Sequence, residues 1–440
     1  MSTRHTTPLE QPPGSQPPGS QRPNEVPVPG NQPRWLTRLS RLPAWVFVLG
    51  YAVAAAGCGA LALTGGGHLV DLHVYLTGGQ AVFHGSRLYQ VQYAQLPFTY
   101  PPFAAVLFAA LSGLAWGAAG VLITVVSAVL FPVMLYLALR LPPVSRWLDP
   151  AAALRLALLA ATAGIWLEPV RTTLGYGQVN LLLGVAVLYD LSRGDQVRHK
   201  GLLIGIAAGV KLTPGVFAVY LLLTRRYRAA ALAAAAFAAT VAVGFAASPA
   251  SSRDYWLHLW LNPGHISPVQ NAANQSLYGA LSRNLHSPNV QLAWMLAAAV
   301  VAVAGLALAA FAQRGGDEAT GFSLCAVTGL LISPISWTHH WVIAVPALLL
   351  AAVAALLRMG QGKPGGKAAL AGVAVLACAG WAGIAHGVPG HHWLHLDPWG
   401  LISSEIYVVA GLAVLALAAG LAVRRMISRD HGLGRQPAGR

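Results

Sequence analysis

The chain has 440 residues, of which 56% are hydrophobic and only 9% are charged, and its mean hydropathy is +0.57. Because soluble domains carry about 25% charged residues, this composition excludes an ordinary soluble enzyme and indicates an all-α polytopic membrane protein. The formal net charge of +15 does not indicate nucleic-acid binding, because the basic residues lie at the ends of apolar runs, where membrane topology accounts for them.

The N-terminal stretch is rich in proline, glutamine and glycine and contains the repeat QPPGSQPPGS. Such a composition cannot form a packed core, so residues 1–43 are expected to be a disordered tail. Three arginines, Arg34, Arg38 and Arg41, precede the first apolar run, 45–63. The positive-inside rule places them in the cytoplasm, so the residues after this run are predicted to face the outside of the cell.

Apolar runs of membrane-spanning length recur along the chain and predict about 10 to 12 transmembrane helices. Two stretches depart from this pattern. Residues 103–116 would form a helix about 21 Å long, which is too short to cross comfortably, so a re-entrant or interfacial helix is expected. Residues 201–223 are interrupted by Lys211, Thr213 and Pro214. The interruption predicts two short broken helices beside a protein-lined cavity.

The basic links set the topology, with residues 44–425 forming one transmembrane domain in the plasma membrane. Both termini, including a tail at 426–440, are predicted to lie in the cytoplasm. The external links are predicted at 65–102, 248–290, 336–341 and 385–404. Within 44–425, most polar residues other than lysine and arginine lie in these external links or in the GYGQVN turn, which is also predicted to be external, whereas the inner links carry mainly positive charge. This one-sided distribution predicts a pocket that opens toward the outer leaflet and the periplasm.

The external stretch 71–102 begins with Asp71, one of only 13 acidic residues in the chain. It also contains side chains that suit a polar ligand better than a lipid tail: His73, Tyr75, Arg87 and Tyr100. An aspartate that reaches a hydroxyl and is shielded from bulk water can act as a general base. We therefore predict an external catalytic loop with Asp71 as the base; the simpler interpretation is a solvated carboxylate at a helix end.

His339 and His340 follow the sequence SPISWT. One interpretation is an interfacial pair with Trp337 and Trp341. The other is a role in the site, since a histidine can donate to a phosphate or accept from a sugar hydroxyl. We expect at least one of the two to belong to the site. Lys211 can likewise be interpreted as a side chain that extends to the interface or as part of the site.

His391 and His395 form an i, i+4 pair in the sequence HHWLHLD. Without an HExxH motif or a cysteine partner, this pair does not predict a metal site, and no metal or other cofactor is expected. The chain also has neither a Walker A motif nor a GxGxxG turn after a strand, so a bound nucleotide is not predicted. An enzyme that faces outward would instead use a lipid-linked phosphate as its activated donor, reaching the site from the bilayer.

At these residues the chain resembles the polyprenol-phosphate-mannose-dependent α-(1→2)-mannosyltransferases of actinobacteria, which are family 87 glycosyltransferases with the GT-C membrane fold. The matching segments lie in order within 71–342: DLHVYLTGGQAVFHGSRLY, LPFTYPPFAAVLF, GYGQVNLLL, GVKLTP, NQSLYGALSR and SPISWTHHWV. The resemblance implies a metal-independent, inverting transfer of mannose from polyprenyl-phosphate-mannose to a mannose-containing glycolipid or lipoglycan, with an α-(1→2) bond. It implies that Asp71 corresponds to the family's base and that the His339–His340 pair contains its late histidine.

The chemistry of this transfer suggests roles for further side chains. A departing phosphate requires positive or hydrogen-bonding groups around it. The candidates are Arg171, Lys211, His339 and His340. Gln178 and Asn180 are predicted to bind sugar hydroxyls, and Asn274, Gln275 and Arg283 are predicted to line the acceptor side.

Two other classes of function compete with the enzyme. Broken helices and an intramembrane lysine also occur in secondary transporters, but the two halves of this chain show no similarity. A non-catalytic membrane scaffold is the third alternative. Several properties stay open at this point: the acceptor, among phosphatidylinositol mannosides, lipomannan and arabinan caps; which of the two histidines acts; the length of the donor lipid; and the oligomeric state.

Overall fold

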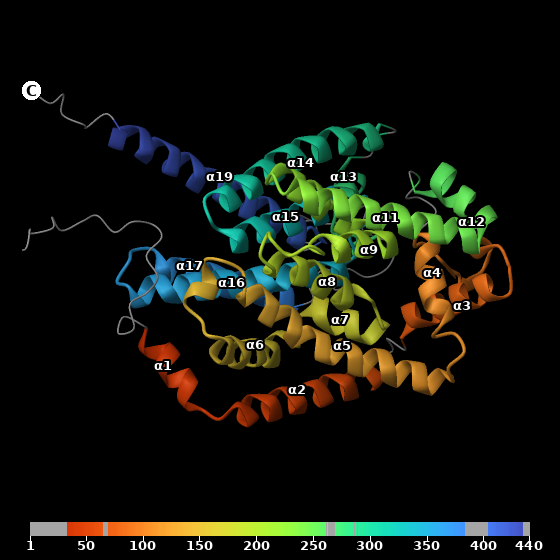
Figure 1. The fold of residues 1–440 in the computed structure, drawn as a ribbon, viewed down its shortest axis with the longest axis horizontal. Coiled ribbons are helices and arrows are strands. Elements are labelled where there is room, and N and C mark those ends of the chain that lie inside the picture. Colours follow the sequence, from red (N-terminus) through yellow and green to blue (C-terminus); the bar gives the residue numbers. More distant parts are fainter. Residues whose placement is uncertain are drawn as a thin grey trace, which may run out of the picture.

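A computed structural model of the chain describes residues 33–64, 69–260, 262, 269–285, 287, 289–382 and 404–433. The regular structure of these residues is almost entirely helical (Figure 1). Within them the strands form a single small hairpin, in which β1 (Gln92–Tyr93) pairs antiparallel with β2 (Leu96–Pro97). The prediction of an all-α polytopic membrane protein is confirmed.

In the described parts of the chain, five helical units are long and apolar enough to cross a membrane. They are α5 (Trp116–Leu139), α11 (Tyr227–Ala247), α14 (Val290–Arg314), η6 (Thr338–Ala344) continued by α16 (Val345–Gly360), and α19 (Ile406–Leu433). Two bent pairs of helices can form two more spans: α1 (Arg34–Arg41) with α2 (Ala44–Thr64), bent by 84°, and α6 (Pro150–Gly164) with α7 (Glu168–Tyr176), bent by 83°. The shorter apolar helices are α8 (Asn180–Ser192), α10 (Val216–Leu223), α15 (Glu318–Ile332) and α17 (Gly366–Ala382).

The remaining helical segments are short and connect or cover the spans. They are α3 (Val70–Phe83), η1 (Leu88–Gln90), α4 (Pro102–Ala109), η2 (Val144–Arg146), α9 (Leu202–Val210), η3 (Thr213–Gly215), α12 (Pro249–Asp254), η4 (Tyr255–Leu259) and α13 (Leu277–Asn284). Helices α3, α4 and α12 gather at the right-hand end of the molecule in Figure 1. Helix α1 and the C-terminal end of α19 lie at the opposite end.

The stretch predicted as an external catalytic loop is largely helical, which corrects the prediction. Asp71 lies in the first turn of α3, where a carboxylate is favoured by the partial positive charge of the helix N-terminus. The helix forms because its inner face is apolar and because glycines allow close packing on α4. A Cβ atom at Gly79 would lie only 2.6 Å from the backbone carbon of Phe108. The predicted link 248–290 likewise contains α12, η4 and α13, and 336–341 overlaps η6.

Both departures from regular spans that the sequence predicted occur in the structure. The stretch 103–116 contains only the eight-residue helix α4, which confirms a helix too short to cross; its depth in the bilayer stays a prediction. The stretch 201–223 is broken into α9, η3 and α10, and Lys211 stands at the break with an extended backbone. The helix therefore ends where the charged side chain and Pro214 interrupt it.

Helix α9 is held in place along one face and at its N-terminal end, and this positions Lys211. Gly201, Gly205 and Gly209 are four residues apart and face α11, where added Cβ atoms would overlap its residues. Such small residues allow two membrane helices to approach closely. At its start, the buried Asp190 of α8 accepts hydrogen bonds from two backbone N–H groups of α9, each at 3.0 Å. The last turn of α9 thus delivers Lys211 to a fixed place.

A cluster of buried apolar side chains connects α3 and α4 to the break at Lys211. It includes Tyr75, Phe98, Phe108, Leu183 and Val210. These residues come from α3, the loop before α4, α4 itself, α8 and α9. Their packing brings the helix that carries Asp71 against the helices that carry Asn180 and Lys211.

Candidate active site

Gln178 joins Asp71 to His339 at the centre of the candidate site. Its Nε2 atom donates to Asp71 Oδ2 at 2.6 Å and lies 3.2 Å from His339 Nε2. An amide nitrogen can only donate, so His339 accepts through Nε2. The three side chains come from α3, the turn after α7, and η6. Gln178 is separated from Asp71 by 107 residues and from His339 by 161, so only the fold brings them together.

The turn GYGQ places Gln178 through a glycine in the left-handed conformation. Gly177 follows α7 with φ +69°, a backbone conformation that side chains with a Cβ rarely adopt. A Cβ atom there would also lie 3.0 Å from the Cβ of Leu72, the neighbour of Asp71. The glycine therefore allows the chain to turn sharply while α7 stays close to α3.

Two tyrosines hold the amide of Gln178 in this orientation. Tyr75 Oη lies 2.8 Å and Tyr100 Oη 3.2 Å from Gln178 Oε1, and the two hydroxyls are 2.9 Å apart. Burial raises the pKa of both phenols, so they stay protonated. With Oε1 occupied by these hydroxyls, Nε2 is the end of the amide that faces Asp71.

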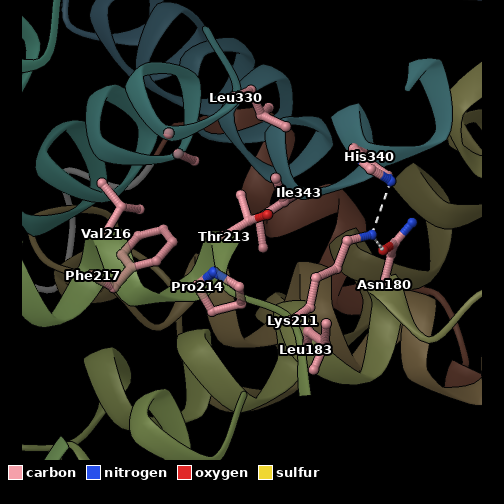
Figure 2. Close-up of a pocket in the computed structure, with 12 residues that line it drawn as sticks. Asn180, Leu183, Lys211, Thr213, Pro214, Val216, Phe217, Leu330, His340 and Ile343 are labelled. Atoms are coloured by element: carbon pink, nitrogen blue, oxygen red, sulfur yellow. Dashed lines mark hydrogen bonds between the residues drawn. The ribbon is translucent and has the colours of Figure 1, made fainter. Parts of the chain in front are cut away.

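A second group of polar side chains surrounds Lys211. Its Nζ donates to Asn180 Oδ1 at 2.9 Å and lies 2.9 Å from His340 Nε2, which therefore accepts (Figure 2). Asn180 Nδ2 in turn donates to the backbone oxygen of His339 at 3.2 Å. Lys211 Nζ also lies 5.4 Å from the ring centroid of Tyr100, within cation–π range. The groups around Asp71 and Lys211 therefore form one connected network.

A small cavity of about 50 Å³ adjoins the Lys211 group. Figure 2 shows Lys211, Asn180 and His340 together on one side of the cavity and Val216 and Phe217 on the other. The site thus offers hydrogen-bond donors and the amine of Lys211, whose pKa is lowered by burial to about 7, beside an apolar space.

The environment of Asp71 suits a base that works near neutral pH. Burial raises the pKa of its carboxyl group to about 6, while the hydrogen bond from Gln178 and the charge of Lys211 act in the opposite direction. A general base is most effective when its pKa lies near the working pH. Asp71 is therefore mainly ionised at neutral pH and is more basic than an exposed aspartate.

Three predicted site residues near the N-terminal half of the site, His73, Arg87 and Arg171, lie outside this network. His73 is stacked between Tyr93, with ring centroids 4.1 Å apart, and Trp116, at 3.4 Å. Arg87 and Arg171 are exposed. Their proposed binding roles stay predictions.

The metal alternative at His391 and His395, together with residues 385–403 of the last external link, lies outside the described residues.

Asn274 and Gln275, predicted to line the acceptor side, are fully buried and bond to the protein backbone. Asn274 Oδ1 accepts from the backbone N–H of Ser336 at 2.9 Å, and Asn274 forms an isolated β-bridge with Trp337. The backbone N–H of Gln275 donates to the Ser336 oxygen at 2.8 Å, and Thr338 N–H donates to the Ala273 oxygen at 3.0 Å. These bonds hold the segment directly before His339, and contact with an acceptor stays a prediction.

Arg283, the third predicted acceptor residue, forms a buried ion pair with Glu405. The Arg283 Nη2 and Glu405 Oε2 atoms are 2.6 Å apart, and the arginine side chain is 0% exposed. Arg283 also donates to the backbone oxygens of Asn271, at 2.7 Å, and Asn274, at 3.1 Å. The pair therefore connects the start of α19 to the loop that supports His339.

Replacing Arg283 with leucine is expected to lower the free energy of unfolding by about 3 to 5 kcal/mol, because Glu405 would be left buried without its partner. The Arg283→Leu/Glu405→Leu double variant should recover most of this loss. Thermal unfolding in detergent, followed by tryptophan fluorescence, measures the stability of the single and the double variant. A double variant no more stable than the single one would contradict this interpretation of the pair.

The structure adds two residues that were absent from the predicted site. Thr173 Oγ1 donates to the backbone oxygen of His339 at 3.0 Å. The ring of Tyr176 packs edge-on against His339, with centroids 5.4 Å apart. Both residues lie in α7, five and two residues before Gln178, and this closeness in sequence to a predicted site residue was the signal that could have found them.

Comparison with known proteins identifies the family. The sequence profile of glycosyltransferase family 87 matches residues 98–334. The chain is 36% identical over 400 residues to the polyprenol-phosphate-mannose-dependent alpha-(1-2)-phosphatidylinositol pentamannoside mannosyltransferase of Mycolicibacterium smegmatis, covering 86% of this chain and 91% of that protein. The protein of the same description from Mycobacterium tuberculosis strain CDC 1551 is 36% identical over 358 residues, covering 80% of this chain and 81% of the relative.

A third relative has a slightly different description. It is the polyprenol-phosphate-mannose-dependent alpha-(1-2)-phosphatidylinositol mannoside mannosyltransferase of Mycobacterium tuberculosis strain H37Rv, 32% identical over 417 residues, with 91% of this chain and 96% of that protein covered. No solved structure gives a significant match. The family match does not support the transporter and scaffold alternatives. With more than half of the chain matched by the profile and relatives aligned over most of its length, the chain belongs to glycosyltransferase family 87 and is a membrane-embedded glycosyltransferase.

Proposed function

We propose that this enzyme transfers mannose from polyprenyl-phosphate-mannose to a hydroxyl group of a mannose-containing glycolipid or lipoglycan. The observation that carries the proposal is the connected network that joins Asp71 to Lys211 beside a cavity. A partly buried carboxylate can accept the proton of an attacking hydroxyl, and a cation can bind the phosphate that leaves. The relatives, whose names specify this donor, support the same assignment.

In the proposed mechanism, Asp71 takes the proton of the acceptor hydroxyl as its oxygen attacks the anomeric carbon of the mannose. The bond between that carbon and the phosphate oxygen breaks, and polyprenyl phosphate leaves with the bonding electrons. Lys211 and His340 lie together and are placed to stabilise the departing phosphate. His339 lies on the Asp71 side of the network, where it helps to orient Gln178.

Attack from the face opposite the phosphate inverts the anomeric carbon, so a β-linked donor would give an α-linked product. The names of the relatives support an α-(1→2) bond and a phosphatidylinositol mannoside as the acceptor class to test first. Lipomannan branches and arabinan caps are the other acceptors to compare. Asp71, Gln178 and Asn180 are the polar side chains closest in the network to where the sugars would meet.

We also propose that α3 faces the periplasm and that both termini face the cytoplasm. Helix α1, which carries Arg34, Arg38 and Arg41, lies at the end of the molecule opposite α3 and α4 (Figure 1). The C-terminal end of α19, the helix that carries Arg424 and Arg425, lies at that same end. Basic residues gathered at one end support a cytoplasmic position by the positive-inside rule.

The function is tested by incubating the purified enzyme in lipid vesicles with labelled polyprenyl-phosphate-mannose and a panel of acceptors: phosphatidylinositol mannosides, lipomannan and a mannose-free phosphatidylinositol. Label is expected in a mannosylated acceptor, and linkage analysis of the product should give an α-(1→2) bond. Absence of transfer to every acceptor, or the same transfer by a variant without Asp71, would contradict the proposal. Cysteine labelling at position 71 from the outside tests the orientation.

The rate of transfer is expected to fall as the pH drops through about 6, because protonation of Asp71 removes the base. The Gln178→Leu variant loses the hydrogen bond that favours the ionised carboxylate of Asp71. The midpoint of its curve of rate against pH should therefore move to higher pH. Measuring kcat from about pH 5 to about pH 8 tests both expectations. Gln80→Leu is the matched control, because Gln80 is exposed on the same helix as Asp71. An unchanged midpoint in Gln178→Leu would exclude Asp71 as the titrating base.

A further inference from the structure

The cavity beside Lys211 has one polar end and one apolar end. Lys211, Asn180 and His340 form the polar end, as Figure 2 shows. Away from them its walls are built from apolar or small residues of α10, α15 and η6: Val216, Phe217, Ala326, Gly329, Leu330 and Ile343. Apart from the hydroxyl of Thr213, the rest of the lining offers no side chain that can pair with sugar hydroxyls, and burying such hydroxyls without partners would be unfavourable.

Gly329 keeps the apolar end of the cavity open. A Cβ atom at this position of α15 would lie 3.0 Å from Cγ1 of Val216, so a larger side chain there would press on α10. Val216 also lies at the start of a stripe on α10 that continues at i+3 and i+7 to Val219 and Leu223. Val219 and Leu223 are exposed. In a bilayer this stripe would extend the apolar wall of the cavity toward lipid.

We propose that this cavity binds the isoprene units nearest to the phosphate of the lipid donor, with Val216, Phe217 and Leu330 as the contacting side chains. The inference rests on the proposed function and adds the route of the donor chain and the residues that select it. In a polyprenyl phosphate the hydrocarbon begins at the phosphate oxygen, so a phosphate at Lys211 places the first isoprene unit beside it. The acyl chains of an acceptor glycolipid are separated from the reacting hydroxyl by the glycan, so they fit this position less well.

A photoreactive polyprenyl phosphate with a diazirine in its first isoprene unit maps the site in the wild-type enzyme. After irradiation in vesicles, mass spectrometry is expected to find the label on α10 and α15, at or next to Val216, Phe217 and Leu330. Excess unlabelled polyprenyl phosphate should remove the signal. Label confined to helices that do not line the cavity, or label on α10 from a diazirine placed in the acyl chain of a phosphatidylinositol mannoside, would overturn the assignment.

Variants that fill the cavity provide the second test. Val216→Trp and Gly329→Leu are each expected to raise KM for polyprenyl-phosphate-mannose about tenfold or more, since the loss of two buried methylene contacts already has this effect. KM for the acceptor should stay unchanged. Leu222→Trp on the exposed part of α10 and Gly372→Leu in open space on α17 are matched controls, expected to behave like wild type.

The outcomes separate this inference from the proposed function. A wild-type enzyme that does not use polyprenyl-phosphate-mannose would contradict the proposed function itself. A wild-type enzyme that uses it, with donor KM unaffected by Val216→Trp and Gly329→Leu and with label elsewhere, would contradict only the position of the chain. Because the photolabelling uses wild-type protein, a variant that fails to fold does not remove the test.

Discussion

Replacing Asp71 with asparagine is expected to lower kcat for mannosyl transfer by about 100-fold or more, with the fold retained. Asparagine has the same shape as aspartate, and its side-chain oxygen can still accept the hydrogen bond that Gln178 Nε2 donates at 2.6 Å. What it loses is the capacity to take a proton. The measurement is kcat at saturating donor and acceptor, together with binding of polyprenyl phosphate to the purified variant.

Asp149→Asn is the matched control for this variant. Asp149 is exposed and caps the start of α6 by accepting from two backbone N–H groups, a role that asparagine performs equally well. We expect the Asp149→Asn variant to transfer mannose with the same kcat as the wild-type enzyme. If Asp71→Asn retained more than about a tenth of the wild-type rate, a base contribution of the usual size would be excluded. Loss of the pH dependence near 6 in any residual activity would further support the role of Asp71.

Replacing Lys211 with methionine is expected to lower kcat/KM for the donor by about 100-fold, because the positive charge would be missing both when the phosphate binds and when it leaves. Methionine retains most of the volume and apolar length of the side chain. The loss should appear in both kcat and donor KM, while acceptor KM stays near wild type. Steady-state kinetics with varied donor and varied acceptor separate these effects.

Lys363→Met, a change at an exposed residue, is the control for general effects of removing a positive charge. Lys211→Arg gives a further comparison, because it keeps the charge but not the compact ammonium that fits between Asn180 and His340, each 2.9 Å from Nζ. We expect kcat/KM for the donor in Lys211→Arg to lie between the values for wild type and for Lys211→Met. If Lys211→Met bound polyprenyl phosphate and transferred mannose as well as wild type, the phosphate would have to bind elsewhere.

Several parts of the fold could be predicted because they depend on neighbouring residues. The length of an apolar run decides whether a helix can span a bilayer, and the predicted run 45–63 corresponds closely to α2 (Ala44–Thr64). The break in 201–223 could be predicted because Lys211 and Pro214 oppose a continuous apolar helix wherever they occur. The helix α3 was missed because its glycines and polar residues resemble those of a loop, and its stability depends on packing against α4 and other distant elements.

The candidate site could be predicted in part. Asp71, Gln178, Lys211 and the histidine pair were chosen for their chemistry, and the structure brings them together. The same reasoning could not distinguish Asn274 and Arg283, whose polar groups face into the protein and hold the loop before His339. Glu405, the partner of Arg283, is 122 residues away and gave no local signal. Whether a polar side chain meets a ligand or another part of the chain depends on which segments pack against it.

The amino-acid sequence by itself determined that this protein spans a membrane many times, where its helix at 201–223 breaks, and at the ends of which apolar runs its basic residues accumulate. These properties follow from the hydrophobicity, helix length and charge of adjacent residues. Only the tertiary structure decided that Gln178 bridges Asp71 and His339, that Lys211 lies between Asn180 and His340, and that an apolar cavity begins beside it. The physical reason is that these contacts join residues far apart in the chain, and their distances result from the close packing of several helices at once.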